Sequence, residues 1–217
     1  MNIIDTSSSS NKNKDFKKSI KNIPLFKTKG IEYELPSKEY TNIIFQSIAA
    51  VDFFKEHELI KNKNVFSMGK STQNYLAQKK IKSISPNSPG SEELKKLLSK
   101  NKNDGNYLIV KGEEGLSEIF NYLNVAGEIV DEVICYKRLK FDSYEHIKEA
   151  FYKVDAIIFT STYAFEIFFE EIYSKKMNLK FLSISQRISK FIKEKGFNSD
   201  LIDYFSNDLE EQIKKLI

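Results

Sequence analysis

The chain has 217 residues, of which 41% are hydrophobic and 29% charged, a balance typical of a folded, water-soluble protein. Its 34 Lys and Arg against 30 Asp and Glu leave a net charge of +4 spread along the sequence, which argues against a nucleic-acid partner. A single cysteine excludes an intramolecular disulfide, and no apolar stretch reaches the roughly 18 residues of a membrane span. We therefore expect a cytoplasmic protein that has neither a nucleic-acid nor a membrane partner.

The first 36 residues predict a short strand, a loop, a second apolar segment and a connecting strand. Residues 2–5 indicate the strand, the polar run at 7–14 a mobile loop, and residues 23–26 the apolar segment. Residues 31–35 alternate in polarity and end at Pro36, a pattern typical of a strand at the margin of a sheet. We expect this strand to connect two parts of the chain.

The sequence then contains an internal repeat with a spacing of about 115 residues. IIFQSIAAVDFF and IIFTSTYAFEIF each run from an apolar strand through a serine, Ser47 or Ser161, into a helix. Two similar domains that face each other would form a cleft, where small ligands usually bind. The repeated pairs are 43–54 with 157–168, 65–81 with 181–197, and 91–98 with 206–213.

The segment between the two copies adds a strand, a helix and a long final strand. Residues 107–111 form a continuous apolar run that ends at Gly112, as a buried parallel strand does. Apolar residues then recur with helical spacing over 116–123, and Gly127 suits the end of that helix. Residues 128–141 read as one more strand without an internal turn.

Strands that alternate with helices predict an α/β fold in which helices flank parallel sheets, here as two similar flavodoxin-like domains joined by a two-stranded ladder. In this interpretation the second domain is inserted into the first. Domain 1 comprises residues 1–30 and 142–217, domain 2 comprises 35–136, and residues 31–34 and 137–141 are the connecting strands.

Polar turns at the carboxyl ends of the strands are the candidate binding sites, because helix N-termini point free N–H groups outward there. A serine at such a turn can also simply cap its helix. The turn Gly69–Lys70–Ser71–Thr72 lacks the earlier glycine of a Walker motif, which argues against a nucleoside triphosphate. Further candidates are Ser47, Gly112 with Glu113, Ser161 with Thr162, and Ser185 with Gln186 and Arg187.

Few side chains offer catalytic chemistry. Tyr136 ends an apolar strand, where it either packs in the core or donates a proton at a cleft mouth. His57 and His146 lie in polar helical segments without companions, and Cys135 is interpreted as a small core residue. We therefore expect no metal site and no nucleophile activated by a base.

Six motifs in this order resemble the uroporphyrinogen-III synthase family over nearly the whole chain. The resemblance implies an enzyme of haem biosynthesis without a cofactor, acting as a monomer and fed by hydroxymethylbilane synthase. Such an enzyme closes linear hydroxymethylbilane to uroporphyrinogen III, inverts ring D and releases water. The motifs are IIFQSIAAV, FSMGKSTQNYL, SPGSEELKKLL, YLIVKGEEG, EVICYKRL and IIFTSTYAFEIFF.

The resemblance also assigns residues. Tyr136 matches the tyrosine that assists departure of the hydroxyl, and Thr72 matches the threonine of the first glycine-containing turn. The second copy departs from the family, because Ser185 to Ile188 replace a glycine and threonines. Two alternatives stay open: a protein that binds a small anion without catalysis, and a structural or interaction protein with an apolar interface.

Overall fold

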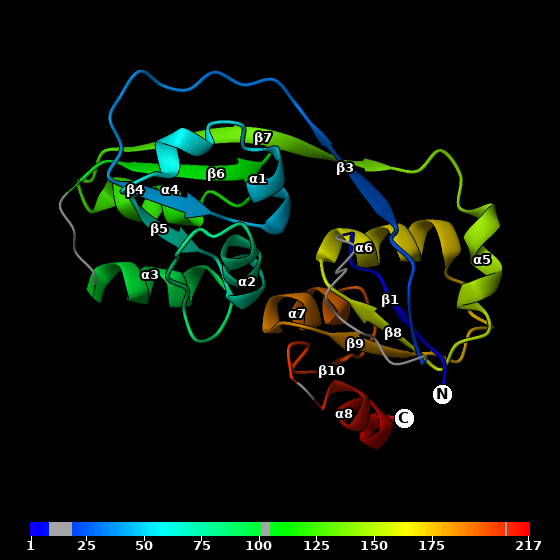
Figure 1. The fold of residues 1–217 in the computed structure, drawn as a ribbon. Helices are drawn as coiled ribbons and strands as arrows, with labels where there is room; N and C mark the ends of the chain where they lie inside the picture. The colour runs from blue at the N-terminus through cyan, green and yellow to red at the C-terminus, as the bar shows by residue number, and fades with distance from the viewer. Residues whose placement is uncertain (9–18, 101–104, 207) are drawn as a thin grey trace. The chain divides into compact units, whose positions relative to one another are not determined.

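The computed structural model describes residues 1–8, 19–100, 105–206 and 208–217, which divide into two compact units. Unit 1 consists of residues 1–27 and 139–217, and unit 2 of residues 28–138. The chain passes between the units within β3 (Phe26–Gly30) and returns within β7 (Val130–Lys140). These two strands are neighbours in one sheet (Figure 1), so a pair of strands connects the units as the sequence predicts.

Unit 2 is a sheet of order β3-β7-β6-β4-β5 with helices on both faces. The pairs from β7 to β5 are parallel, and strands such as NIIF and YLIV are buried over their whole length and mostly apolar because both of their faces are covered. α1 and α2 pack on one face beside Phe45, while α3 and α4 pack on the other beside Ile44. The elements are β4 (Asn42–Phe45), α1 (Ile48–Phe53), η1 (His57–Ile60), β5 (Asn64–Ser67), α2 (Lys70–Gln78), α3 (Ser91–Lys100), β6 (Tyr107–Gly112) and α4 (Glu118–Val125).

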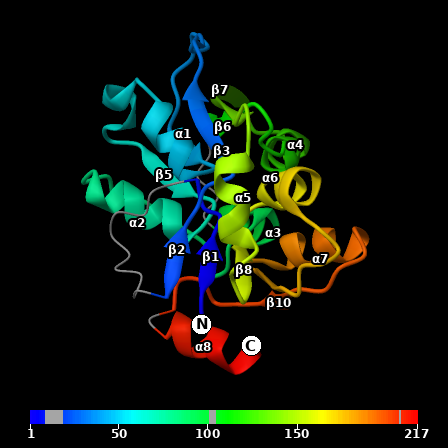
Figure 2. The ribbon, with the colours of Figure 1, turned by 90° about the vertical axis from the view of Figure 1, so that its right-hand side faces the viewer.

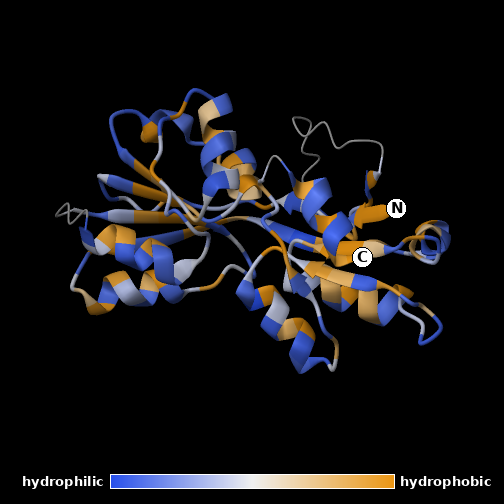
Figure 3. Ribbon diagram, turned by 90° about the horizontal axis from the view of Figure 1, so that it is seen from below, coloured by the Kyte–Doolittle hydropathy of each residue, from blue (hydrophilic) through white to orange (hydrophobic). Residues whose placement is uncertain are grey.

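Unit 1 is built in the same way around a sheet of order β10-β9-β8-β1-β2, with β1 and β8 side by side in Figure 2. α5, α6, η2 and α7 cover one face, and α8 packs on the other. The strands are largely hydrophobic and the helices carry hydrophilic residues between hydrophobic ones (Figure 3). The elements are β1 (Ile3–Asp5), β2 (Ile20–Asn22), α5 (Glu145–Phe151), β8 (Ala156–Phe159), α6 (Thr162–Ile167), the π-helical η2 (Phe168–Ile172), β9 (Lys180–Ser183), α7 (Gln186–Glu194), β10 (Asp200–Leu201) and α8 (Leu209–Leu216).

The register of the strands reproduces the internal repeat. Ile43 pairs with Val65 across β4 and β5, and Ile157 pairs with Phe181 across β8 and β9, the positions that the repeat aligns. The helices agree as well. In unit 2, α1 and α3 pack on opposite faces of the sheet, and in unit 1 the corresponding helices, α6 and α8, do the same. The predicted α/β fold with two similar parallel sheets is confirmed.

The predicted connecting strand at residues 31–34 is wrong in position. The strand lies upstream, at β3, and residues 31–36 form no strand. Tyr33 explains the difference: its ring stacks on Phe54 at 6.2 Å, and its hydroxyl accepts a hydrogen bond from the Lys55 amide at 2.6 Å. Side-chain packing on the end of α1 therefore holds this segment in place of a strand ladder.

Other elements follow the sequence closely. α4 ends just before Gly127, which adopts a positive φ of 82°, and β7 runs without a turn to Lys140. Most of the expected loop at 7–14 lies outside the described residues. Among the helices of the described residues, none combines the length and apolarity needed to cross a membrane.

Candidate functional site

The candidate site of unit 2 lies along the carboxyl edge of its sheet. Because β4, β5 and β6 are parallel and in register, the residues that follow them emerge at the same edge. Ser47 follows β4, Gly69 follows β5, and Gly112 ends β6 opposite Tyr136 of β7. A shift in register between Lys111 and Gly112 creates this last pairing.

Three of the predicted residues are in direct contact here. The hydroxyl oxygens of Ser47 and Tyr136 are 2.9 Å apart and hydrogen-bonded. A β-carbon added to Gly112 would lie 2.5 Å from Cζ of Tyr136, so only glycine leaves room for the phenol ring. Glu113 is exposed, and its amide donates to the Tyr136 carbonyl at 2.9 Å.

Tyr136 is firmly held. Its side chain is only 4% exposed, and its ring stacks on Phe53 with centroids 6.0 Å apart. Ser47 is partly exposed and caps α1, because the Ala50 amide donates to its Oγ at 3.1 Å. Both readings left open for these residues therefore have support: Tyr136 is packed and Ser47 caps its helix, yet their hydroxyls meet.

The turn before α2 presents a mixture of exposed and buried residues. Gly69 is the N-cap of α2, and an added β-carbon there would lie 2.9 Å from Cβ of Pro89. Lys70 is exposed and Ser71 partly exposed, but Thr72 is buried in the first turn with 3% exposure. The structure therefore does not place the side chain of Thr72 on the surface of this edge.

Unit 1 repeats these turns at the carboxyl edge of its own sheet. Ser161 caps α6 by accepting from the Ala164 amide at 3.1 Å, and Thr162 follows it partly exposed. Ser185 caps α7 by accepting from the Ile188 amide at 3.4 Å. Gln186 and Arg187 are exposed.

The sequence reasoning missed a buried lysine beside the site of unit 2. Lys111 is 3% exposed, and its ammonium lies 2.9 and 3.0 Å from the two carboxylate oxygens of Glu132 and 3.0 Å from Oγ of Ser117. A charge that is this deeply buried needs such partners. The signal was available, because a lysine ends the otherwise apolar run YLIVK.

A second polar cluster, in unit 1, was also missed. Asp5 is fully buried at the end of β1, where its carboxylate accepts from the Ser7 amide at 2.9 Å and from the Tyr204 hydroxyl at 2.7 Å. The amide group of Asn22 donates to the carbonyls of Asp5 and Ser7 at 3.0 Å. This network fixes the carboxyl ends of β1 and β2, and an acidic residue at the end of an apolar strand was its sequence signal.

The remaining candidates for chemistry are one thiol and two imidazoles. Cys135 is fully buried, and burial raises the pKa of its thiol to about 12, so it is a core residue and no nucleophile. His57 and His146 are exposed. Over the described ranges, no three His, Cys, Asp or Glu side chains gather as metal ligands would.

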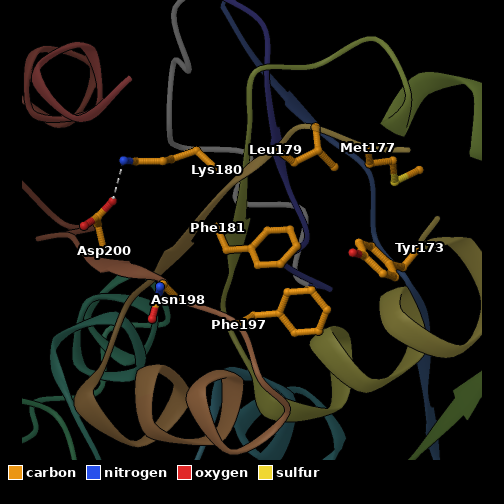
Figure 4. Close-up of a pocket in the computed structure, with 8 residues that line it drawn as sticks. All are labelled: Tyr173, Met177, Leu179, Lys180, Phe181, Phe197, Asn198 and Asp200. Atoms are coloured by element: carbon orange, nitrogen blue, oxygen red, sulfur yellow. Dashed lines mark ion pairs between the residues drawn. The ribbon is translucent and has the colours of Figure 1, made fainter. Parts of the chain in front are cut away.

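A pocket of about 310 Å³ in unit 1 lies away from the turns of that unit. It opens beside the first residues of β9, Lys180 and Phe181, whereas the candidate turns follow the last residues of their strands (Figure 4). Phe197 and Tyr173 contribute aromatic walls, and Lys180 forms an ion pair with Asp200 at 3.3 Å. None of the predicted site residues lines this pocket.

Comparisons with known proteins agree on one family. The family model described as Uroporphyrinogen-III synthase HemD matches residues 22–204. Uroporphyrinogen-III synthetase from Helicobacter pylori is similar, with 18% identity, a TM-score of 0.71, and coverage of 100% of this chain and 99% of that chain. A mutant uroporphyrinogen III synthase from Thermus thermophilus has 14% identity and a TM-score of 0.60 over 99% of this chain and 98% of its own.

No curated protein sequence matches the chain. The two structures share its fold at identities too low to show more than that, whereas the family model covers most of the sequence. The chain belongs to the uroporphyrinogen-III synthase family.

Proposed function

We propose that the chain cyclises linear hydroxymethylbilane to uroporphyrinogen III, with inversion of ring D and loss of water, as a step of haem biosynthesis. The match of the family model to residues 22–204 carries this proposal. Contact between Tyr136, Ser47 and Gly112 at the carboxyl edge of a parallel sheet supports it, because ligands bind at such edges in open α/β folds.

Tyr136 is the acid that assists departure of the substrate hydroxyl. Its phenol can donate a proton, and Gly112 and Phe53 hold its ring in one position. Thr72 is assigned to the catalytic group on the family resemblance alone, since it is buried in the first turn of α2. Ring inversion needs shape and charge placement more than strong acids and bases, which fits a site with one phenol and many amide donors.

The remaining candidates bind the substrate, which carries an acetate and a propionate on every pyrrole ring. Exposed cations and hydroxyls suit such a polyanion, whereas the carboxylate of Glu113 repels it, so Glu113 is proposed only as part of the turn that follows Gly112. Helix N-termini add N–H donors at the same turns. The proposed contacts are Ser47, Gly69, Lys70, Ser71, Gly112 and Glu113 in unit 2, and Ser161, Thr162, Ser185, Gln186 and Arg187 in unit 1.

The alternative is a protein that binds a small anion without catalysis, and the isoleucine at position 188 supports it, because the family has a threonine in this turn. Ile188 is 2% exposed and packs in the core of unit 1, at the repeat position that Thr72 occupies in unit 2. Both positions are buried, so the isomer assay decides between the two functions.

The experiment is an isomer assay. Hydroxymethylbilane, prepared enzymatically and used at once, is incubated with the purified chain, and the oxidised products are separated by chromatography. We expect uroporphyrin III in excess over the type I isomer that forms spontaneously. Type I product alone, at the rate of the enzyme-free control, contradicts the proposal.

We also propose that the enzyme works as a monomer in the cytoplasm and receives its labile substrate from hydroxymethylbilane synthase. The lone buried Cys135 suits a reducing compartment. Light scattering of the purified chain should give the mass of one 25.2 kDa chain, and a larger mass contradicts the monomer.

A further inference from the structure

We propose that Ser47 is the hydroxyl that meets the departing group and that Tyr136 supplies its proton through Ser47. This inference rests on the proposed function and assigns the two hydroxyls different roles. Ser47 becomes the catalytic contact with the substrate, and Tyr136 the proton source behind it.

The first observation is the difference in burial. Tyr136 is 4% exposed, and its ring is enclosed by Phe53 on one side and by Gly112 on another, where an added β-carbon would lie 2.5 Å from Cζ of the ring. Ser47 is partly exposed and follows β4 at the carboxyl edge of the sheet. A bulky pyrrole substrate at that edge reaches the serine hydroxyl before the phenol.

The second observation is the count of hydrogen bonds at Ser47. A hydroxyl oxygen accepts two hydrogen bonds and donates one. The Ala50 amide takes one acceptor position at 3.1 Å. Either hydroxyl of the 2.9 Å pair can donate; we assign Tyr136 as the donor to the second position, because a phenol gives up its proton more readily than an alcohol, and the proton of Ser47 then faces the exposed side.

The proton transfers balance without a further reactant. As the carbon–oxygen bond of the hydroxymethyl group breaks, its electron pair stays on oxygen, which takes the proton of Ser47 and leaves as water. Ser47 takes the proton of Tyr136, which becomes a phenolate. The substrate loses one proton when the macrocycle closes, and that proton returns along the same path.

The test is a double-mutant cycle on the full chain with Ser47→Ala, Tyr136→Phe and the double variant. Each single change should lower kcat roughly tenfold with little change in KM. This effect falls below the usual range of about 10²–10⁴ for a positioned acid because the hydroxyl also leaves unaided. The double variant should fall no further, since both changes interrupt one path. Independent effects, with the double variant roughly a hundredfold slower, overturn the relay.

Two further variants separate the relay from the cap. Ser47→Thr keeps both the cap and a hydroxyl and should retain most of the activity. Ser47→Asn keeps a good cap but has no acidic proton, so its stability in urea should match the wild type while kcat falls to the level of Ser47→Ala. If Ser47→Asn keeps the wild-type kcat, the relay is overturned. If the wild-type protein itself forms no type III product, the proposed function is refuted.

Discussion

Gly112→Ala probes the fit between the glycine and the phenol ring. The φ of Gly112 lies outside the left-handed region, so alanine is sterically limited only by its neighbours. Its β-carbon would lie 2.5, 2.8 and 2.9 Å from three ring atoms of Tyr136. Reaching an ordinary contact of about 3.5 Å requires the ring to move by about 1 Å. A shift of that size directed away from Ser47 stretches their 2.9 Å hydrogen bond to about 3.9 Å, too long to persist, and Gly112→Ala tests whether the ring moves in that direction.

Overpacking of this kind costs about 1–3 kcal/mol, so urea unfolding should show that loss. Turnover should fall to that of Tyr136→Phe, since both variants disconnect the phenol. Gly196→Ala is the matched control: Gly196 has a positive φ of 86° and no atoms within 4 Å of an added β-carbon, so alanine costs about 1 kcal/mol through strain, outside the proposed site. Full kcat in Gly112→Ala together with the expected stability loss would refute the link between this contact and turnover.

Three further outcomes are expected. Tyr136→Phe should slow turnover by a modest factor and leave the urea midpoint near that of the wild type; full activity removes Tyr136 from the mechanism. Product binding, measured by fluorescence, should weaken as the salt concentration rises from about 50 to about 500 mM, because carboxylate recognition is electrostatic and salt screens exposed charges. An affinity that does not change with salt contradicts electrostatic recognition of the carboxylates. Burial raises the pKa of the Cys135 thiol from 9.0 in the unfolded chain to about 12 in the folded protein. The unfolded chain therefore ionises first, so the stability that the protonated thiol contributes is complete below pH 9 and is lost as the pH rises toward 12. Between about pH 8 and about pH 10 the wild type should lose about 1.4 kcal/mol more unfolding free energy than Cys135→Ala; equal losses contradict the burial argument.

Much of the fold was accessible from local patterns. The run IIF before Ser47 and its copy before Ser161 predict buried strands and the helices that follow, because apolar periodicity and capping residues act over a few residues. The repeat then fixes the correspondence of the two sheets, and the register of β4 with β5 matches that of β8 with β9. The prediction failed at residues 31–34, because the packing of Tyr33 on Phe54 overrides the alternating pattern.

The sequence by itself determined the α/β class, the duplication and the turns that carry the candidate residues, since each depends on neighbours along the chain. Only the tertiary structure decided which candidates meet. Ser47 and Tyr136 are separated by 89 positions, and the order of the strands brings their hydroxyls together. Tertiary packing also decided that Thr72 and Ile188 are buried and that Lys111 pairs with Glu132. These contacts depend on strand order, register and the space that a missing β-carbon leaves at Gly112, which no local pattern encodes.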